Sequence, residues 1–300
     1  MRAALFRSIR EFFYIHGFLE VDTPIRQPVC IPEGNIVPLM ADGHYLQSSP
    51  ELLMKRLLAA GSARIFQICH CFRGEECGRF HLREFRMLEW YRINSDYTEL
   101  MDDCENLLRH VCTGLVDSLT EFDGVATGNI DVFKDIDLYS RWLRLTVAEA
   151  FERFSPVPLT QALAEDIFDE LLVEHVEPKL GFDTPLFLHD YPVELASLAR
   201  KKPGEPAIAE RFELYIKGVE LANGFSELTD GVEQRARFVE EIEKIEKNGR
   251  CTTGMPEKFL SDLDLLESAA GIALGCDRLF MLALGLHCID DAVSFSEGDF

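Results

Sequence analysis

The sequence is poor in basic residues relative to acidic ones, with 30 Lys and Arg against 52 Asp and Glu and a net charge of −22 over 300 residues. Because affinity for nucleic acids depends largely on neutralising phosphates, the chain as a whole repels a polyphosphate. No stretch reaches the length of a membrane span, which needs about 20 uninterrupted apolar residues. The N-terminus also lacks a secretory signal, because it is typical of an amphipathic helix with Arg2, Arg7, Arg10 and Glu11 on its polar side. We therefore expect a cytoplasmic protein with no membrane partner and no strong affinity for nucleic acid.

The nine cysteines do not form a recognisable framework. Their odd number argues against a set of disulfides. Cys69, Cys71 and Cys77 lie near His70 and His81 in the sequence, but the paired C-x2-C knuckles of a zinc site are missing, so we expect reduced thiols. Repeats, low-complexity tracts and a convincing Ser, Cys or His nucleophile are also lacking.

With 47% apolar residues the chain can bury a large core, and we expect one domain over residues 1–300. Helical patterns cover residues 95–123 and, with high charge, residues 232–250. Residues 124–140 are typical of a loop, and residues 141–180 alternate strand and helix patterns.

Residues 64–92 are the most informative part of the sequence. A first apolar run ends at Arg73 and Glu75, a short loop of Gly, Arg and His follows, and a second apolar run ends on Glu89 and Tyr91. This pattern predicts two antiparallel strands joined by a basic loop.

The residue types in this hairpin suit an ATP site. Arg73 offers a planar guanidinium to a phosphate, and Arg79 and His81 could close over the outer phosphates of a nucleotide. Phe85 would supply a face for the purine ring. The alternative is a surface hairpin with ordinary charged positions.

A second segment, residues 268–284, makes that alternative less attractive. It is an apolar run interrupted by Gly271 and Gly275 and then by Asp277 and Arg278. Two glycines in a strand let a backbone or a ligand approach closely, and the helix that follows presents Arg278 near its start. Two separate segments therefore each deliver an arginine to the end of an apolar strand.

These segments together resemble the class II aminoacyl-tRNA synthetases. FLEVDTPI with Pro24 resembles motif 1, FRGEE through FRMLEWY resembles motif 2, and GIALGCDR resembles motif 3. QSSPELLMKRLL at 47–58 and ELYIKGVELANGFSELTD at 213–230 resemble the lysyl branch. The resemblance covers nearly the whole chain in the family's order. It implies an α+β catalytic core, with a mostly antiparallel sheet flanked by helices and a homodimer interface built by motif 1. The strands that suit this core are expected at 43–47, 64–72, 84–92, 213–225 and 268–276.

The resemblance also implies the residues of the site. The catalytic residues would be Arg73, Glu75 and Arg278. The residues expected to bind ATP are Arg73, Gly74, Glu75, His81, Leu82, Phe85, Glu220, Leu221, Gly275 and Arg278. The residues expected to bind the amino acid are Ser49, Pro50, Glu51, Glu89, Tyr91, Asn223, Phe225, Glu227 and Ala273.

Within that pocket Glu51 resembles the residue that takes the amino group near the reacting carboxylate. Glu89, Tyr91 and Glu227 resemble those that take the distal ammonium, and a pocket for a diammonium ion needs buried carboxylates. Glu213 and Glu220 would bind Mg²⁺ on the ATP phosphates. Taken alone, two glutamates seven residues apart are more often a solvated face.

Lysyl-tRNA synthetases resemble this sequence only over their catalytic half, and we expect no anticodon-binding OB domain here. A lysyl-type core without that domain is similar to the elongation factor P lysine ligases, whose substrates are ATP, (R)-β-lysine or lysine, and one lysine of elongation factor P. Ala273 stands where lysyl enzymes typically have glycine, and its methyl either disfavours α-lysine or merely fills core volume. The motif 2 loop reads His81-Leu82-Arg83-Glu84-Phe85 in place of HNPEF.

Two alternatives remain open at this stage. The first is a truncated enzyme of the lysyl type that acts on tRNA or makes adenylate-derived products. The second is a non-enzymatic regulator that keeps the fold. Retention of Arg73, Glu75, Glu220 and Arg278 argues against the regulator.

Overall fold

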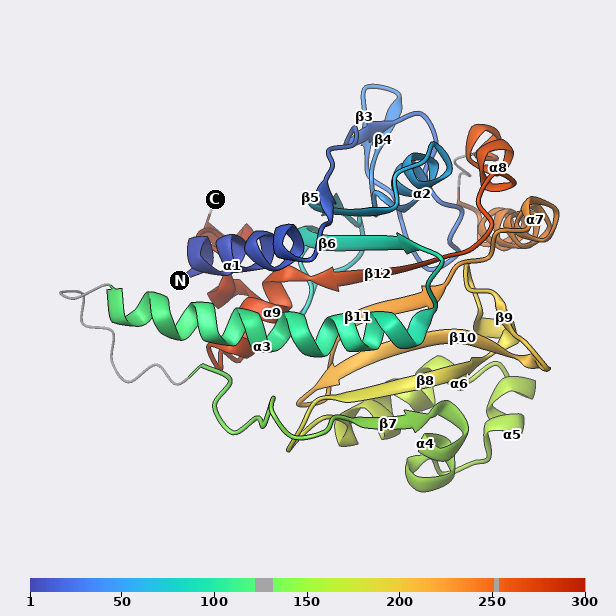
Figure 1. The fold of residues 1–300 in the computed structure, drawn as a ribbon. Helices are drawn as coiled ribbons and strands as arrows, with labels where there is room; N and C mark the ends of the chain where they lie inside the picture. The colour runs from blue at the N-terminus through green and yellow to red at the C-terminus, as the bar shows by residue number, and fades with distance from the viewer. Residues whose placement is uncertain (122–131, 251–253, 300) are drawn as a thin grey trace.

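The computed structural model describes residues 1–121, 132–250 and 254–299, and it confirms an α+β fold (Figure 1). Within these residues a nine-stranded mixed sheet runs in the order β1-β5-β6-β12-β11-β10-β8-β7, with β9 paired to β10. Its strands are β1 (Leu19–Glu20), β5 (Arg64–Phe72), β6 (Glu84–Ile93), β7 (Leu143–Thr146), β8 (Leu186–Pro192), β9 (Lys201–Lys202), β10 (Glu205–Ile216), β11 (Val219–Ser226) and β12 (Ala269–Gly275). A small second sheet has the order β2-β4-β3, formed by β2 (Arg26–Gln27), β3 (Met40–Ala41) and β4 (His44–Leu46).

The centre of the large sheet is antiparallel, and parallel pairs occur at its two edges. β5 and β6 form the expected hairpin, with an unbroken register from Arg64 opposite Arg92 to Phe72 opposite Glu84. β12 pairs with both β6 and β11, so the chain's last strand lies in the middle of the sheet. This insertion brings the two arginine-bearing segments next to each other.

The expected strands at 43–47, 64–72, 84–92 and 268–276 are confirmed to within a few residues. The region 213–225 forms parts of β10 and β11, which meet at Lys217 and Gly218. Both of these residues have positive φ, at 51° and 74°, as a tight hairpin turn requires. β10 begins eight residues earlier than expected because it pairs with β8 on one side and β9 on the other.

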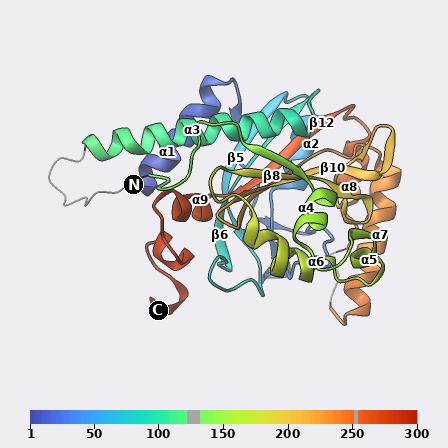
Figure 2. The ribbon, with the colours of Figure 1, turned by 90° about the horizontal axis from the view of Figure 1, so that it is seen from below.

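Three helices cover one face of the sheet: α1 (Arg2–Ile15), α3 (Tyr97–Glu121) and α9 (Cys276–Ala283). α1 and α3 pack against each other, as both views show (Figures 1 and 2). The main core lies between these helices and alternate strand positions such as Phe66, Trp90 and Ile272. Because side chains alternate along a strand, the residues in between point to the opposite face.

The opposite face is only partly covered, by α2 (Glu51–Ala59), α7 (Gly231–Lys247) and α8 (Glu257–Leu263), which share a second apolar cluster with the sheet. α7 matches the charged helix expected over 232–250, and the Asp230 side chain caps its start by accepting from the amides of Val232 and Glu233. This half-open face is where the sequence places the candidate site residues.

A separate apolar cluster lies beside β8 at the far edge of the sheet. It is built by α4 (Val147–Phe154), α5 (Leu159–Ala164) and α6 (Phe168–Leu171). The strand and helix pattern expected over 141–180 is therefore correct only in part, because β7 is followed by helices and turns up to residue 179. A π-helical turn at 172–176 and a 3-10 turn at 177–179 follow. A reciprocal bond pair between Thr146 and Glu149 fixes the start of α4.

The expected loop at 124–140 falls partly on residues 122–131, which lie outside the described residues; its remainder is a set of turns. Within the part of the chain that the structure describes, no helix is long and apolar enough to cross a membrane.

Candidate active site

The half-open face of the sheet carries a row of candidate residues from four adjacent strands. Glu89 on β6 lies opposite Ala273 on β12, Ala273 lies opposite Asn223 on β11, and Asn223 lies opposite Glu213 on β10. Opposite residues on antiparallel strands point to the same face. The sheet register therefore collects four residues that lie far apart in the sequence.

A second row lies two residues further along each strand. It consists of Tyr91, Gly271, Phe225 and Arg211, in the same strand order. Arg211 is absent from the residues expected from sequence. It lies two positions before Glu213, so strand alternation alone could have placed it on the same face.

Glu89 is the most deeply buried carboxylate of the first row, at 1% exposed. Its two oxygens accept hydrogen bonds from Ser49 Oγ and from the Tyr91 hydroxyl, both at 2.6 Å. Burial raises the pKa of Glu89 to about 8, and the charge of Glu51 adds to this effect. The two hydroxyls are neutral, so neither compensates the negative charge of Glu89 when it is ionised.

Gly271 creates the space in which Tyr91 and Glu227 lie. A Cβ atom at this position would stand 2.2 Å from Tyr91 Cε1 and 2.4 Å from Glu227 Oε1. Both contacts are far shorter than van der Waals distance, so a side chain here requires the pocket to rearrange. The glycine noted in the sequence therefore serves close approach between side chains.

Glu51 and Glu227 share one internal partner. Lys55 Nζ lies 2.5 Å from Glu51 Oε1 and also contacts Glu227 Oε2. Burial raises the pKa of Glu227 to about 8, although the positive charge of Lys55 opposes the shift. Sequence reasoning missed Lys55, yet its position four residues after Glu51 on a helix was a usable signal.

Arg73 leaves the end of β5 beside the ring of Phe85, with its guanidinium carbon 5.3 Å from the ring centre. It donates to Glu76 at 3.0 Å, and its buried Nε has no partner among the described residues. Glu75, expected beside Arg73, is exposed and makes no hydrogen bond or ion pair with another described residue. The ion pair of Arg73 is therefore made with Glu76, which was not singled out from the sequence.

Arg278, at the start of α9, ties the motif 2 loop to β11. It donates to the carbonyl of Phe80 at 3.1 Å and to the carbonyl of Glu220 at 2.8 Å, and its NH2 lies 2.7 Å from His81 Nε2. Burial and the charge of Arg278 lower the pKa of His81. These contacts join the two arginine-bearing segments.

Glu213 and Glu220 lie near the turn between β10 and β11. Glu213 accepts from Arg211 at 2.7 Å and from Tyr215 at 2.6 Å. Burial raises the pKa of Glu213, although the charge of Arg211 opposes the shift. Tyr215 also reaches Glu177 at 3.0 Å. Among the described residues no group of three or more His, Cys, Asp or Glu is arranged to hold a metal ion. Two carboxylates still match Mg²⁺, which commonly takes one or two from the protein and the rest from phosphates and water.

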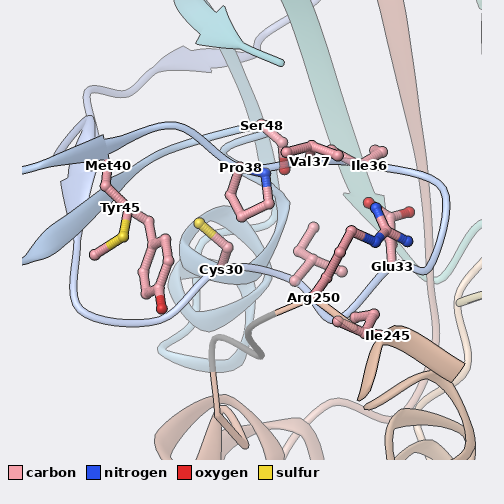
Figure 3. A pocket seen from close by; sticks show the side chains of 11 residues that line it. Cys30, Glu33, Ile36, Val37, Pro38, Met40, Tyr45, Ser48, Ile245 and Arg250 are labelled. Atoms are coloured by element: carbon pink, nitrogen blue, oxygen red, sulfur yellow. The ribbon is translucent and has the colours of Figure 1, made fainter. Parts of the chain in front are cut away.

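A strap of residues 30–38 crosses the rim of this face. The Gly74 amide donates to the Val37 carbonyl at 2.7 Å, and the Gly34 amide donates to Glu241 on α7 at 2.9 Å. The strap borders a cavity of about 190 Å³ with Glu33 near one end and Met40 and Tyr45 near the other (Figure 3).

Glu33 was not expected from the sequence. Burial raises its pKa to about 7, and the charges that act on it next are those of Glu51, Arg73, Glu241 and Arg211. The strap therefore adds another carboxylate at the edge of the site.

The remaining expected residues divide into two groups. Ser49, Pro50, Ala273 and Gly275 border the site; a Cβ at Gly275 would meet only carbons of Arg278, at 3.6 Å or more. The side chains of Leu82 and Leu221 pack with the main core. These two residues can meet a ligand at the site only through their backbone.

The family of tRNA synthetases class II (D, K and N) matches residues 1–298 of this chain. Curated relatives are named elongation factor P–(R)-β-lysine ligase. The Salmonella gallinarum protein is 38% identical over 98% of this chain and 93% of its own length. The Yersinia enterocolitica protein is 38% identical over 99% and 94%, and the Proteus mirabilis protein is 37% identical over 98% and 93%.

Proposed function

We propose that this chain, which belongs to the tRNA synthetases of class II (D, K and N), is an ATP-dependent ligase acting on elongation factor P. It activates (R)-β-lysine or lysine as an adenylate and transfers the aminoacyl group to the ε-amino group of one lysine of that factor. The observation that carries the proposal is the buried set of carboxylates Glu51, Glu89 and Glu227 beside an arginine-rich nucleotide site. The names of the relatives support the choice of acceptor.

In the first step a carboxylate oxygen of the amino acid attacks the α-phosphorus of ATP, and pyrophosphate leaves. The nucleophile comes from the substrate, so the protein has to position it and offset charge. Arg73 has an unused buried Nε for the α-phosphate, and its guanidinium stacks beside Phe85. Arg278 holds the loop that bears His81, so it can stabilise the departing pyrophosphate.

Recognition of the amino acid uses its ammonium groups. Glu89 is held in place by Ser49 and Tyr91, and it presents a buried negative charge to the distal ammonium. The raised pKa of Glu89 means that ammonium binding favours loss of its proton. Glu51 and Glu227 lie around Lys55 in the same pocket.

Mg²⁺ would be held by Glu213 and Glu220 together with ATP phosphates. Its chemistry there is the neutralisation of phosphate charge. Arg211 and Tyr215 orient the Glu213 carboxylate, and Arg278 lies 3.3 Å from Glu220 Oε2. These contacts fix the directions of both carboxylates before the nucleotide binds.

In the second step the acceptor's neutral ε-amino nitrogen attacks the adenylate carbonyl carbon. A C–N bond forms as the C–O bond to phosphate breaks, AMP leaves with that oxygen, and the nitrogen releases one proton. The product is an amide, and the site needs no residue of its own as a covalent carrier.

The direct test is the intact mass of elongation factor P after incubation with this protein, ATP, Mg²⁺ and (R)-β-lysine. Parallel reactions contain α-lysine or tRNA. We expect the mass of the factor to increase by one lysyl unit. A larger fraction of the factor should be modified with the β isomer than with α-lysine. Charged tRNA with an unmodified factor would instead support the truncated tRNA-charging enzyme.

We further propose that the chain acts as a homodimer. Tyr14, Ile15 and Leu19 are exposed apolar side chains at the end of α1 and on the edge strand β1. Exposed apolar surface beside an unpaired edge is typical of an interface. Light scattering at micromolar concentration should give twice the chain mass, and a monomer mass would contradict the proposal.

A further inference from the structure

Lys55 lies inside the amino-acid pocket, and the steps described above do not use it. Its ammonium contacts Glu51 and Glu227 and lies 5.2 Å from the centre of the Phe225 ring, while its side chain is 1% exposed. Burial lowers the pKa of Lys55, but the charges of Glu227 and Glu51 outweigh it, so the pKa stands above its ordinary value. A pocket for a diammonium substrate therefore contains a fixed cation of its own.

The geometry of this contact ties the two carboxylates together. One nitrogen contacts Glu51 Oε1 and Glu227 Oε2, so these inner oxygens are neighbours and each carboxylate keeps one further oxygen. Glu227 Oε1 has no hydrogen-bond partner among the described residues, and Gly271 leaves it space. The two outer oxygens are therefore held at a separation that Lys55 sets.

The balance of charges in the pocket also points to a role for Lys55. Glu51, Glu89 and Glu227 contribute three buried carboxylates when ionised, and Lys55 cancels one of them. The remaining charge equals that of two ammonium groups. A substrate with two amines then neutralises the pocket, whereas a monoamine leaves a buried carboxylate uncompensated.

We propose that Lys55 is a specificity-determining residue that fixes the spacing of the amine-accepting oxygens and so selects the length of the diamino acid. The proposal rests on the proposed function. The two amines of β-lysine are separated by one methylene fewer than those of α-lysine. A misfit of one methylene changes discrimination by about 10- to 200-fold. Because β-lysine is the substrate of the proposed function, we expect the spacing that Lys55 fixes to match the shorter separation of its amines.

The test measures binding of putrescine and cadaverine, which differ by the same methylene, by calorimetry at pH 8.5. The wild-type protein should bind putrescine about tenfold more tightly than cadaverine. Lys55→Arg contacts the two carboxylates through separate nitrogens and widens their spacing, so the ratio should fall about tenfold. Lys55→Met removes the contact that joins the two carboxylates, so the ratio of the affinities for putrescine and cadaverine should move close to one.

The matched control is Arg56→Lys, on the same helix. Arg56 pairs with Asp262 on α8, outside the pocket, so the ratio should stay at the wild-type value. Folded Lys55 variants that keep that ratio would overturn the proposal. If neither Lys55 variant folds, Glu227→Asp tests the proposal instead. Its shorter side chain retracts the outer oxygen, so the preference should shift to the longer diamine. An unchanged ratio of the two affinities would refute the proposal.

Two kinds of failure are separable. A wild-type protein that binds neither diamine nor lysine would refute the amino-acid pocket and the proposed function with it. A wild-type protein that binds them, with a ratio that no variant moves, refutes only the role of Lys55.

Discussion

Glu89→Gln is the substitution that tests the amino-acid pocket most directly. It keeps the shape of the side chain, and its amide oxygen can accept from one of the two hydroxyls of Ser49 and Tyr91, which now donate to separate carboxylate oxygens at 2.6 Å. The other hydroxyl would accept from the new NH2 group, and the negative charge is removed. The proposed function requires that charge to hold the distal ammonium.

The expected loss follows from the energy of a charged hydrogen bond. Such bonds contribute about 1.5 to 3 kcal/mol, and about 1.4 kcal/mol corresponds to a factor of ten. The KM for the amino acid in ATP–pyrophosphate exchange should therefore rise between about 10- and 150-fold. The KM for ATP should stay within about twofold, because the hydrogen bonds of Glu89 go to Ser49 and Tyr91 and not to the residues proposed to bind ATP or Mg²⁺.

The thermal stability of the Glu89→Gln variant should not decrease, although its binding of the amino acid weakens. Burial raises the pKa of Glu89 from 4.5 to about 8, so the native state without ligand binds more protons than the unfolded state between these values. This group's contribution to the free energy of unfolding is therefore fully present below pH 4.5 and is lost as the pH rises to about 8. Glutamine has no charge, so the variant avoids the destabilisation caused by an ionised, buried Glu89 at high pH. The melting temperature of the variant at pH 8.5 should equal or exceed that of the wild type.

Glu210→Gln is the matched control. Glu210 is also buried and accepts from Arg200 Nε at 2.7 Å, but it lies outside the pocket. Its substitution should lower the melting temperature and leave the amino-acid KM unchanged. An unaltered KM in Glu89→Gln, or a melting temperature at pH 8.5 well below that of the wild type, would refute the reasoning.

Three further outcomes are expected. Gly271→Ala places a Cβ 2.2 Å from Tyr91 Cε1. In pyrophosphate exchange the KM for the amino acid should rise at least about tenfold, with little change in the KM for ATP. Unchanged kinetics would contradict the close approach at this glycine. Arg278→Ala loses the bonds to Phe80 and Glu220, so kcat and the KM for ATP should both worsen, with kcat/KM down about 100-fold or more; a change confined to the amino-acid KM would contradict its assignment. Ala273→Gly removes a methyl group from the first row of the pocket. The kcat/KM for α-lysine, relative to that for β-lysine, should rise by up to about tenfold. An unchanged isomer preference would mean that the methyl group only fills core volume.

Much of the fold was predictable because local patterns and tertiary pairing agree. The hairpin of β5 and β6 was expected at 64–72 and 84–92, since apolar runs interrupted by a Gly and Arg loop specify both strands and turn. β9 and the early start of β10 were not expected. Their strand state depends on pairing with neighbours distant in sequence, and short polar segments carry little pattern of their own.

Within the site, sequence motifs indicated which residue types take part, and the sheet register decided which of them meet. Arg73 and Arg278 were identified from their places at strand ends, and the structure brings both to the motif 2 loop. The ion pair of Arg73 with Glu76 was not expected. In a loop without periodicity the sequence does not determine which of two adjacent carboxylates turns inward.

The sequence by itself determined the chemistry available to this protein: its excess of carboxylates, its two arginine-bearing strand ends and its glycines at Gly271 and Gly275. Only the tertiary structure decided that Lys55 lies between Glu51 and Glu227, and that the strap bearing Glu33 borders the site. The physical reason is that burial and charge coupling depend on segments far apart in the chain. A lysine on an amphipathic helix remains a surface residue until a sheet from elsewhere in the sequence packs over it.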